Sequence, residues 1–304
     1  MLRAGDHDNL RYTLSRLHPE SLPGILEAML DVLDAGEDSS RWLERLWQWY
    51  RGNREGLALN ALIHGQLRHA WICHRRGRRW HAEFTEALAE SERLLERAVA
   101  RQPDDADLLN LRLVSARGLK LPLSEHWARF RALLTVAPTH YWGHLNMLEN
   151  LQARWCGSDE AMFRFARGRA GHLPAGHLLR ALPVLAHMAK LEAFAASAED
   201  AAGAAWFGQA EVGEQVAALW QELRECLAEQ GNAQADELLN QFAVACYLCG
   251  RADLAGDALD RLDGRCTRDP WCWLARTERE RHNPGWVVDR IKAEIAAQSP
   301  APAQ

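Results

Sequence analysis

The residues best suited to chemistry lie between positions 64 and 81. A basic run interrupted by one glycine ends in an aromatic residue and comprises Arg75, Arg76, Arg78, Arg79 and Trp80. Guanidinium groups form paired hydrogen bonds with carboxylates and phosphates, and an indole ring stacks on a nucleobase. We interpret the run as a solvated loop paired with acids of the same chain, as a surface for an acidic protein partner, or as an RNA contact, in that order. These five residues are the candidates for partner binding.

Histidine and cysteine gather in the same region, at His64, His69, Cys73, His74 and His81. His69 and Cys73 are four residues apart, so they share one helical face and could begin a metal site. A structural zinc ion needs four converging ligands, which tight turns normally supply. Cys246 and Cys249 lie instead inside an apolar helical segment, which favours core packing. We therefore expect no metal and no other cofactor, with a metal-dependent enzyme using residues 64–81 as the alternative.

No catalytic motif stands out along the chain. The sequence contains neither a Gly-x-Ser-x-Gly elbow, nor a glycine-rich phosphate loop, nor a His-Glu-x-x-His helix. The paired carboxylates Asp104 and Asp105 stand at an expected helix start, where the helix dipole already accounts for them. We expect the protein not to be an enzyme and assign no catalytic residue.

The elements that would hold these residues are helices. Strand signals are nearly absent, and alanine, leucine, glutamate and arginine dominate, all of which favour helices. Apolar side chains recur at spacings of three and four, as in Leu88, Ser91, Leu95, Ala98 and Val99. Ser124 and Ser158 are expected to cap helix starts, because acidic residues follow each of them. The pattern predicts an all-α fold of about a dozen helices.

Proline spacing indicates a helical repeat. Pro103, Pro138 and Pro174 lie 35 and 36 residues apart, each after an amphipathic segment. A period near 34 is typical of tetratricopeptide repeats, in which two helices form each unit. Residues 235–263 read as a further unit, whereas residues 194–213 fit no period. The prediction is a tetratricopeptide-like α-solenoid array, with an irregular helical bundle as the alternative.

Three regions are expected along the chain. Residues 1–80 form an N-terminal helical region, residues 81–298 form the repeats and continue from it, and residues 299–304 form a disordered Pro/Ala tail.

Three segments resemble a bacterial family of domains of unknown function built on tetratricopeptide-like helices. The matching residues are 94–105, then 137–141, then 155–162, the last resembling the family's Trp-Gly-Gly-Ser turn. Cys156 stands where the family usually has glycine. The resemblance implies the repeat fold and brings no activity or catalytic residue with it.

Composition narrows the functional classes. The formal net charge is −5, which argues against a surface tuned as a whole for nucleic acid. We see no secretory signal and no run of about 18 apolar residues. Seven cysteines, an odd number at irregular spacing, do not form a disulfide framework. We expect a cytoplasmic protein with no membrane contact.

These observations favour a non-enzymatic module that binds a protein or peptide, acting as an adaptor, a regulator or a toxin inhibitor. Nucleic acid is disfavoured as a partner, although RNA binding through residues 75–79 stays open. The sequence does not indicate an oligomeric state.

Overall fold

The computed structural model describes residues 7–16, 22–36, 38–53 and 56–298. Within them the chain forms sixteen α-helices and three short 3-10 helices, and no strand occurs in these ranges. The predicted all-α class is therefore confirmed, although the helices outnumber the dozen expected. The tail at residues 299–304 lies outside the described residues.

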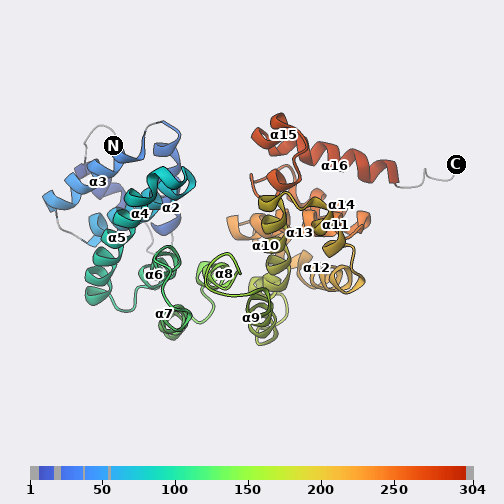
Figure 1. The fold of residues 1–304 in the computed structure, drawn as a ribbon, viewed down its shortest axis with the longest axis horizontal. Helices are drawn as coiled ribbons and strands as arrows, with labels where there is room; N and C mark the ends of the chain where they lie inside the picture. Colours follow the sequence, from blue (N-terminus) through green and yellow to red (C-terminus); the bar gives the residue numbers. More distant parts are fainter. Residues whose placement is uncertain (1–6, 17–21, 37, 54–55, 299–304) are drawn as a thin grey trace. The chain divides into compact units, whose positions relative to one another are not determined.

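The chain divides into two compact units, Met1–Gly157 and Ser158–Gln304. The helices of unit 1 are α1 (His7–Ser15), α2 (Leu22–Asp34), α3 (Ser39–Asn53), α4 (Gly56–Arg75), η3 (Arg78–Trp80), α5 (His81–Arg101), α6 (Ala106–Gly118), α7 (Leu123–Val136) and α8 (Tyr141–Asn150). Each helix from α3 to α7 packs on the next one along the chain, and α6 also packs on α8 (Figure 1).

The helices of unit 2 are α9 (Asp159–Gly171), η4 (Leu178–Ala181), α10 (Leu182–Ser197), α11 (Asp200–Phe207), α12 (Ala210–Gln230), α13 (Ala233–Leu248), α14 (Ala252–Leu262), η5 (Trp271–Leu274), α15 (Glu278–His282) and α16 (Pro284–Gln298). Consecutive helices from α9 to α14 again pack together, α10 contacts α13, and α16 packs on both α14 and α15 (Figure 1). Both units thus consist of sequentially packed helices, as the repeat interpretation predicts.

Most of the helix ends and caps predicted from the sequence are present. Pro103, Pro138 and Pro174 each follow the end of a helix, namely α5, α7 and α9. The Ser158 hydroxyl accepts a hydrogen bond from the Ala161 amide and caps α9, as expected. Ser124 is not a cap, because α7 begins one residue earlier and follows Pro122.

The expected unit at residues 235–263 corresponds to α13 and α14, which pack closely on one another. The turn between them uses Gly250 at φ +69°, in the left-handed region that glycine adopts without a steric penalty. Residues 194–213, which fit no period, contain the short helix α11, which packs on α10, α12 and α13.

The core of unit 1 draws on α1 to α6, and one part of it forms where α3 lies against α4. Trp42, Leu46 and Trp49 of α3 are almost completely buried against the apolar face of α4. Gly65 allows this close approach, because a Cβ atom there would fall on the Leu46 side chain and 3.1 Å from the Trp42 ring.

Replacing Gly65 with alanine is expected to lower the free energy of unfolding by about 2 kcal/mol, the usual cost of overpacking a well-filled core. Gly168→Ala is the control, since a Cβ atom there meets nothing within 4 Å. That change should stabilise α9 by about 0.5 kcal/mol through helix propensity. Urea unfolding measures both, and equal effects of the two substitutions would contradict the close packing at Gly65.

Among the described helices, none combines the length and the apolar character needed to cross a membrane.

Candidate functional site

The arginine-rich run forms an ordered turn between the two longest helices of unit 1. Helix α4 ends at Arg75, the 3-10 helix η3 covers Arg78–Trp80, and α5 begins at His81. Gly77 joins them at φ +91°, a conformation that a residue with a Cβ atom adopts only under strain. We call residues 75–80 the arginine loop.

One of the four arginines is fixed by its own chain. Arg76 donates a hydrogen bond from Nη2 to Asp38 Oδ2 at 3.0 Å, and its guanidinium lies 4.9 Å from the centre of the Trp80 ring. Hydrogen bonds from Ser40, joined by the Arg76 guanidinium, lower the pKa of the Asp38 carboxyl to about 2. Asp38 is therefore charged at neutral pH, and the Asp38–Arg76–Trp80 contacts position the loop.

The other three arginines of the loop face solvent. Arg75, Arg78 and Arg79 are exposed, and none forms an ion pair with a carboxylate of the described residues. Arg79 lies 6.0 Å from the Trp80 ring, which is at the edge of a cation–π contact. The first interpretation from the sequence, in which the arginines pair with acids of the same chain, thus holds for Arg76. The other three guanidinium groups have no such carboxylate partner among the described residues.

An aromatic cluster, made of Trp71, His74, Phe84 and Trp155, flanks the loop. The Trp71 and Trp155 rings meet edge to face with centroids 5.6 Å apart. His74 lies 4.9 Å from Phe84 and 5.8 Å from Trp155. Phe84 is buried, whereas the other three rings are partly or largely exposed. Such rings offer contact area at a small cost in conformational entropy, as interface anchors do.

A further cation lies against the same rings. Arg117 of α6 is 5.1 Å from the Trp71 ring and 5.8 Å from the Trp155 ring, and it donates to Asn150 Oδ1 at 2.9 Å. The Trp155 indole donates to Glu149 Oε1 at 2.7 Å. Trp155 thus joins the turn after α8 to the surface beside α4. The sequence places Trp155 in a turn and carries no local signal of this contact, because 84 positions separate Trp155 from Trp71.

The histidines and cysteine between residues 64 and 81 do not converge. His69 shares a hydrogen bond with the Ser39 hydroxyl at 2.9 Å, and the Cys73 sulfur lies 3.7 Å from its other ring nitrogen. His74 and His81 both pack on Phe84. Within the described part of the chain, no three His, Cys, Asp or Glu side chains lie close enough to hold a metal ion.

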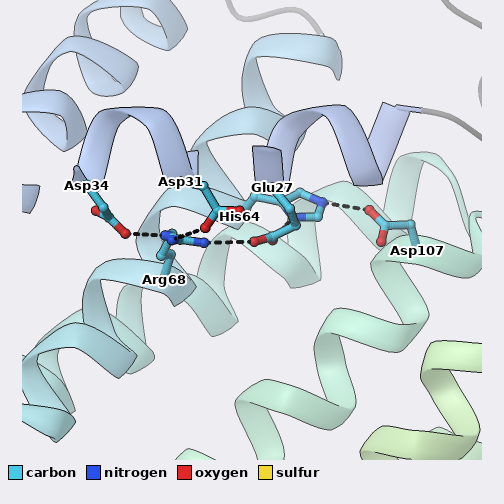
Figure 2. Close-up of polar contacts among 6 residues, drawn as sticks. All are labelled: Glu27, Asp31, Asp34, His64, Arg68 and Asp107. Carbon is cyan, nitrogen blue, oxygen red and sulfur yellow. Dashed lines mark hydrogen bonds and ion pairs between the residues drawn. The ribbon is translucent and has the colours of Figure 1, made fainter. Parts of the chain in front are cut away.

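His64 instead belongs to a buried ionic network that joins α2, α4 and α6 (Figure 2). Its Nδ1 lies 2.9 Å from Glu27 Oε1, and its Nε2 lies 2.7 Å from Asp107 Oδ2. Burial alone would lower the pKa of His64, but the Asp107 charge and hydrogen bonds to Asp107 and Glu27 raise it to about 10. Both ring nitrogens are therefore protonated and donate to carboxylates.

Arg68 completes this network one turn along α4. Its guanidinium donates hydrogen bonds to three carboxylates of α2, those of Glu27 (3.3 Å), Asp31 (2.5 Å) and Asp34 (Figure 2). Glu27, Asp31 and Asp34 are spaced by four and three residues, so they share one face of α2. This face lies opposite the face of α4 that carries His64 and Arg68. This geometry fastens α2 to the core of unit 1 and leaves the arginine loop outside the network.

Unit 2 has an aromatic pocket of about 240 Å³, lined among others by Phe163, His187 and Trp206. The Trp206 indole donates to His187 Nδ1 at 3.1 Å, and His187 Nε2 lies 2.8 Å from Gln215 Oε1. Burial lowers the pKa of His187, and Gln215 only partly offsets this, so the ring is neutral and donates through Nε2. The polar atoms of Trp206, His187 and Gln215 are thus paired with one another and do not specify a ligand.

Comparison with known proteins adds little to this geometry. No family model matches the chain, so membership of the bacterial family remains a prediction. No curated protein matches it either. The crystal structure of PilW, a widely conserved type IV pilus biogenesis factor, matches 78% of this chain and 93% of its own at 13% identity with a TM-score of 0.32. The class defined by the chain's own structure is an all-helical protein of sequentially packed helix pairs.

Proposed function

We propose that this protein is a non-enzymatic module that binds an acidic segment of a protein partner at the arginine loop. The observation that carries the proposal is the placement of three exposed guanidinium groups, from Arg75, Arg78 and Arg79, on a turn fixed by Arg76 and Asp38. Groups held in place before binding lose less conformational entropy when the partner arrives. A guanidinium fork matches a carboxylate with two parallel hydrogen bonds.

The aromatic cluster would supply the apolar part of the same interface. Trp71, His74 and Trp155 are only partly covered. Trp71 and His74 directly precede the loop on α4, and the Trp155 ring contacts both of them. Tryptophan and arginine are the residues most enriched at the energetic centres of protein interfaces. A cytoplasmic adaptor, regulator or inhibitor would use such a surface, and RNA is the competing ligand that the same side chains could bind.

Charge reversal in Arg75→Glu/Arg78→Glu/Arg79→Glu is expected to weaken partner binding at least about 100-fold. Each charge-assisted hydrogen bond contributes about 1.5–3 kcal/mol, and about 1.4 kcal/mol corresponds to tenfold in affinity. Arg76 is left in place, so that the loop keeps its contacts with Asp38 and Trp80. Affinity capture followed by titration of the captured protein measures the effect.

The matched control is Arg97→Glu/Arg131→Glu/Arg268→Glu, which reverses three exposed arginines outside the loop that form no ion pair with the described residues. It should retain wild-type capture. Equal capture by both triple variants would remove the loop from the interface. Capture that ribonuclease abolishes, with an affinity falling steeply with salt, would assign the loop to RNA and contradict the proposal.

A further inference from the structure

A polar cleft of unit 1 crosses α4 between α3 and α5. It is a cleft of about 400 Å³, and its lining residues are Leu43, Trp47, Gln66, His69, Glu83, Glu86, Ala87, Glu90 and Arg93. We call it the acidic cleft. Its volume lies within the range of clefts that bind small ligands or single side chains.

The carboxylates of the cleft lie on one side of α5. Glu83 and Glu86 are exposed and form no ion pair with the described residues, whereas Glu90 pairs with Arg93 at 2.5 Å. Burial lowers the pKa of His69, so this ring is neutral and its charge does not balance the acids. Two negative charges therefore remain uncompensated at the rim of the acidic cleft.

The side-chain amide of Gln66 independently indicates that the cleft lacks a hydrogen-bond donor. Gln66 lines the cleft with only 6% of its surface exposed, and its Oε1 accepts no hydrogen bond within the described structure. An unsatisfied buried acceptor is costly, and native proteins pair the great majority of such groups. Together with the rim carboxylates, Gln66 makes the cleft rich in acceptors and short of donors.

The occupant that fits this chemistry is an organic cation with several N–H donors and an apolar stem. A guanidinium carries five donors and an ammonium three, and neither can accept a hydrogen bond. Leu43 and Trp47 provide apolar surface along which the methylene groups of such a side chain lie. A metal ion fits less well, because the described residues hold no group of three suitable ligands.

We propose that the acidic cleft binds the arginine or lysine side chain of a protein partner. This inference rests on the proposed function, because it supplies a second contact for the same partner. Glu83 follows Trp80 by only three residues, so the acidic cleft begins where the arginine loop ends. A partner segment with an acidic residue for the loop and a basic residue for the cleft would satisfy both surfaces, and this alternation of charge would set its orientation.

The test titrates the full-length protein with N-acetyl-arginine amide and follows the side-chain amide resonances of Gln66 by NMR. Saturable shifts are expected with this probe. N-acetyl-citrulline amide, which has nearly the same shape without the charge, should produce no saturable shift. Glu83→Gln/Glu86→Gln should weaken binding of the arginine amide at least about tenfold. Glu96→Gln, on an exposed position of the same helix outside the cleft, should leave the affinity unchanged.

Three results would overturn the assignment. Equal shifts with arginine and citrulline amides would show that charge is not recognised, and unchanged affinity in Glu83→Gln/Glu86→Gln would place binding elsewhere. Saturation by calcium chloride but not by the arginine amide would make the cleft a metal site. Failure of this test leaves the arginine loop untouched, because the loop is tested by its own charge reversal. If the charge-reversed loop lost no capture or all capture, the titration with N-acetyl-arginine amide would still test the acidic cleft, because the titration needs no protein partner.

Discussion

His64→Ala is expected to lower the free energy of unfolding by about 3 kcal/mol, near the lower end of what breaking a buried ion pair costs. The ring is only 3% exposed, and both of its nitrogens donate to carboxylates from other helices. Without it, Asp107 loses its cation, and Glu27 keeps only the contact with Arg68. Urea unfolding at neutral pH measures this loss. His282→Ala, which removes an exposed histidine, should cost less than about 0.5 kcal/mol.

The stabilisation by His64 should disappear at high pH. The pKa of His64 is raised from 6.5 to about 10 in the folded protein, so folding favours the protonated ring. A raised folded pKa gives a stabilisation that is complete below about pH 6.5 and is lost as the pH rises through about 10. The wild type should therefore lose stability across this window, and the difference from His64→Ala should narrow. Unfolding curves that stay a constant distance apart over the window would contradict the protonated state assigned to His64.

The arginine loop and the helix pairs were predictable because they depend on local sequence. Four arginines within five positions, broken by a glycine, indicate a charged turn wherever the chain goes next. Helix periodicity and the prolines at 103, 138 and 174 mark boundaries through short-range sterics. The extra helices escaped prediction because several are short, such as α15 with five residues. Segments of that length have too few turns to show a periodicity.

The contacts that give each site its character were not predictable from the sequence. His69 and Cys73 do meet at the spacing that suggested a metal site, yet the other ring nitrogen of His69 faces the Ser39 hydroxyl, 30 positions away. His64 finds its carboxylates 37 and 43 positions away. The unpaired Oε1 of Gln66 has no local signature at all. Such partners are determined by the tertiary packing of helices. The apolar periodicity of a sequence indicates that one face of a helix is buried, but not which residues lie against it.

Trp220→Ala should be more damaging than loss of His64, lowering the free energy of unfolding by about 4 kcal/mol. Trp220 is completely buried where α12 meets α13 and α14, and its ring lies 5.4 Å from that of Phe242. Its indole also donates to Asp257 Oδ2 at 3.1 Å. Removal of the side chain leaves a large cavity that rigid neighbouring helices close only in part, so both the transfer energy and the packing contacts are lost.

Two further substitutions separate the sources of this effect. Trp220→Phe keeps most of the apolar volume and removes only the indole donor, while Asp257 retains Arg261 at 2.8 Å. It should cost about 1–2 kcal/mol. Trp142→Ala removes a tryptophan that is 45% exposed and should cost less than about 1 kcal/mol. Similar destabilisation by Trp220→Ala and Trp142→Ala would be incompatible with this core. Equal losses for Trp220→Phe and Trp220→Ala would instead mean that the bond to Asp257, and not the packing of three helices around the ring, stabilises unit 2.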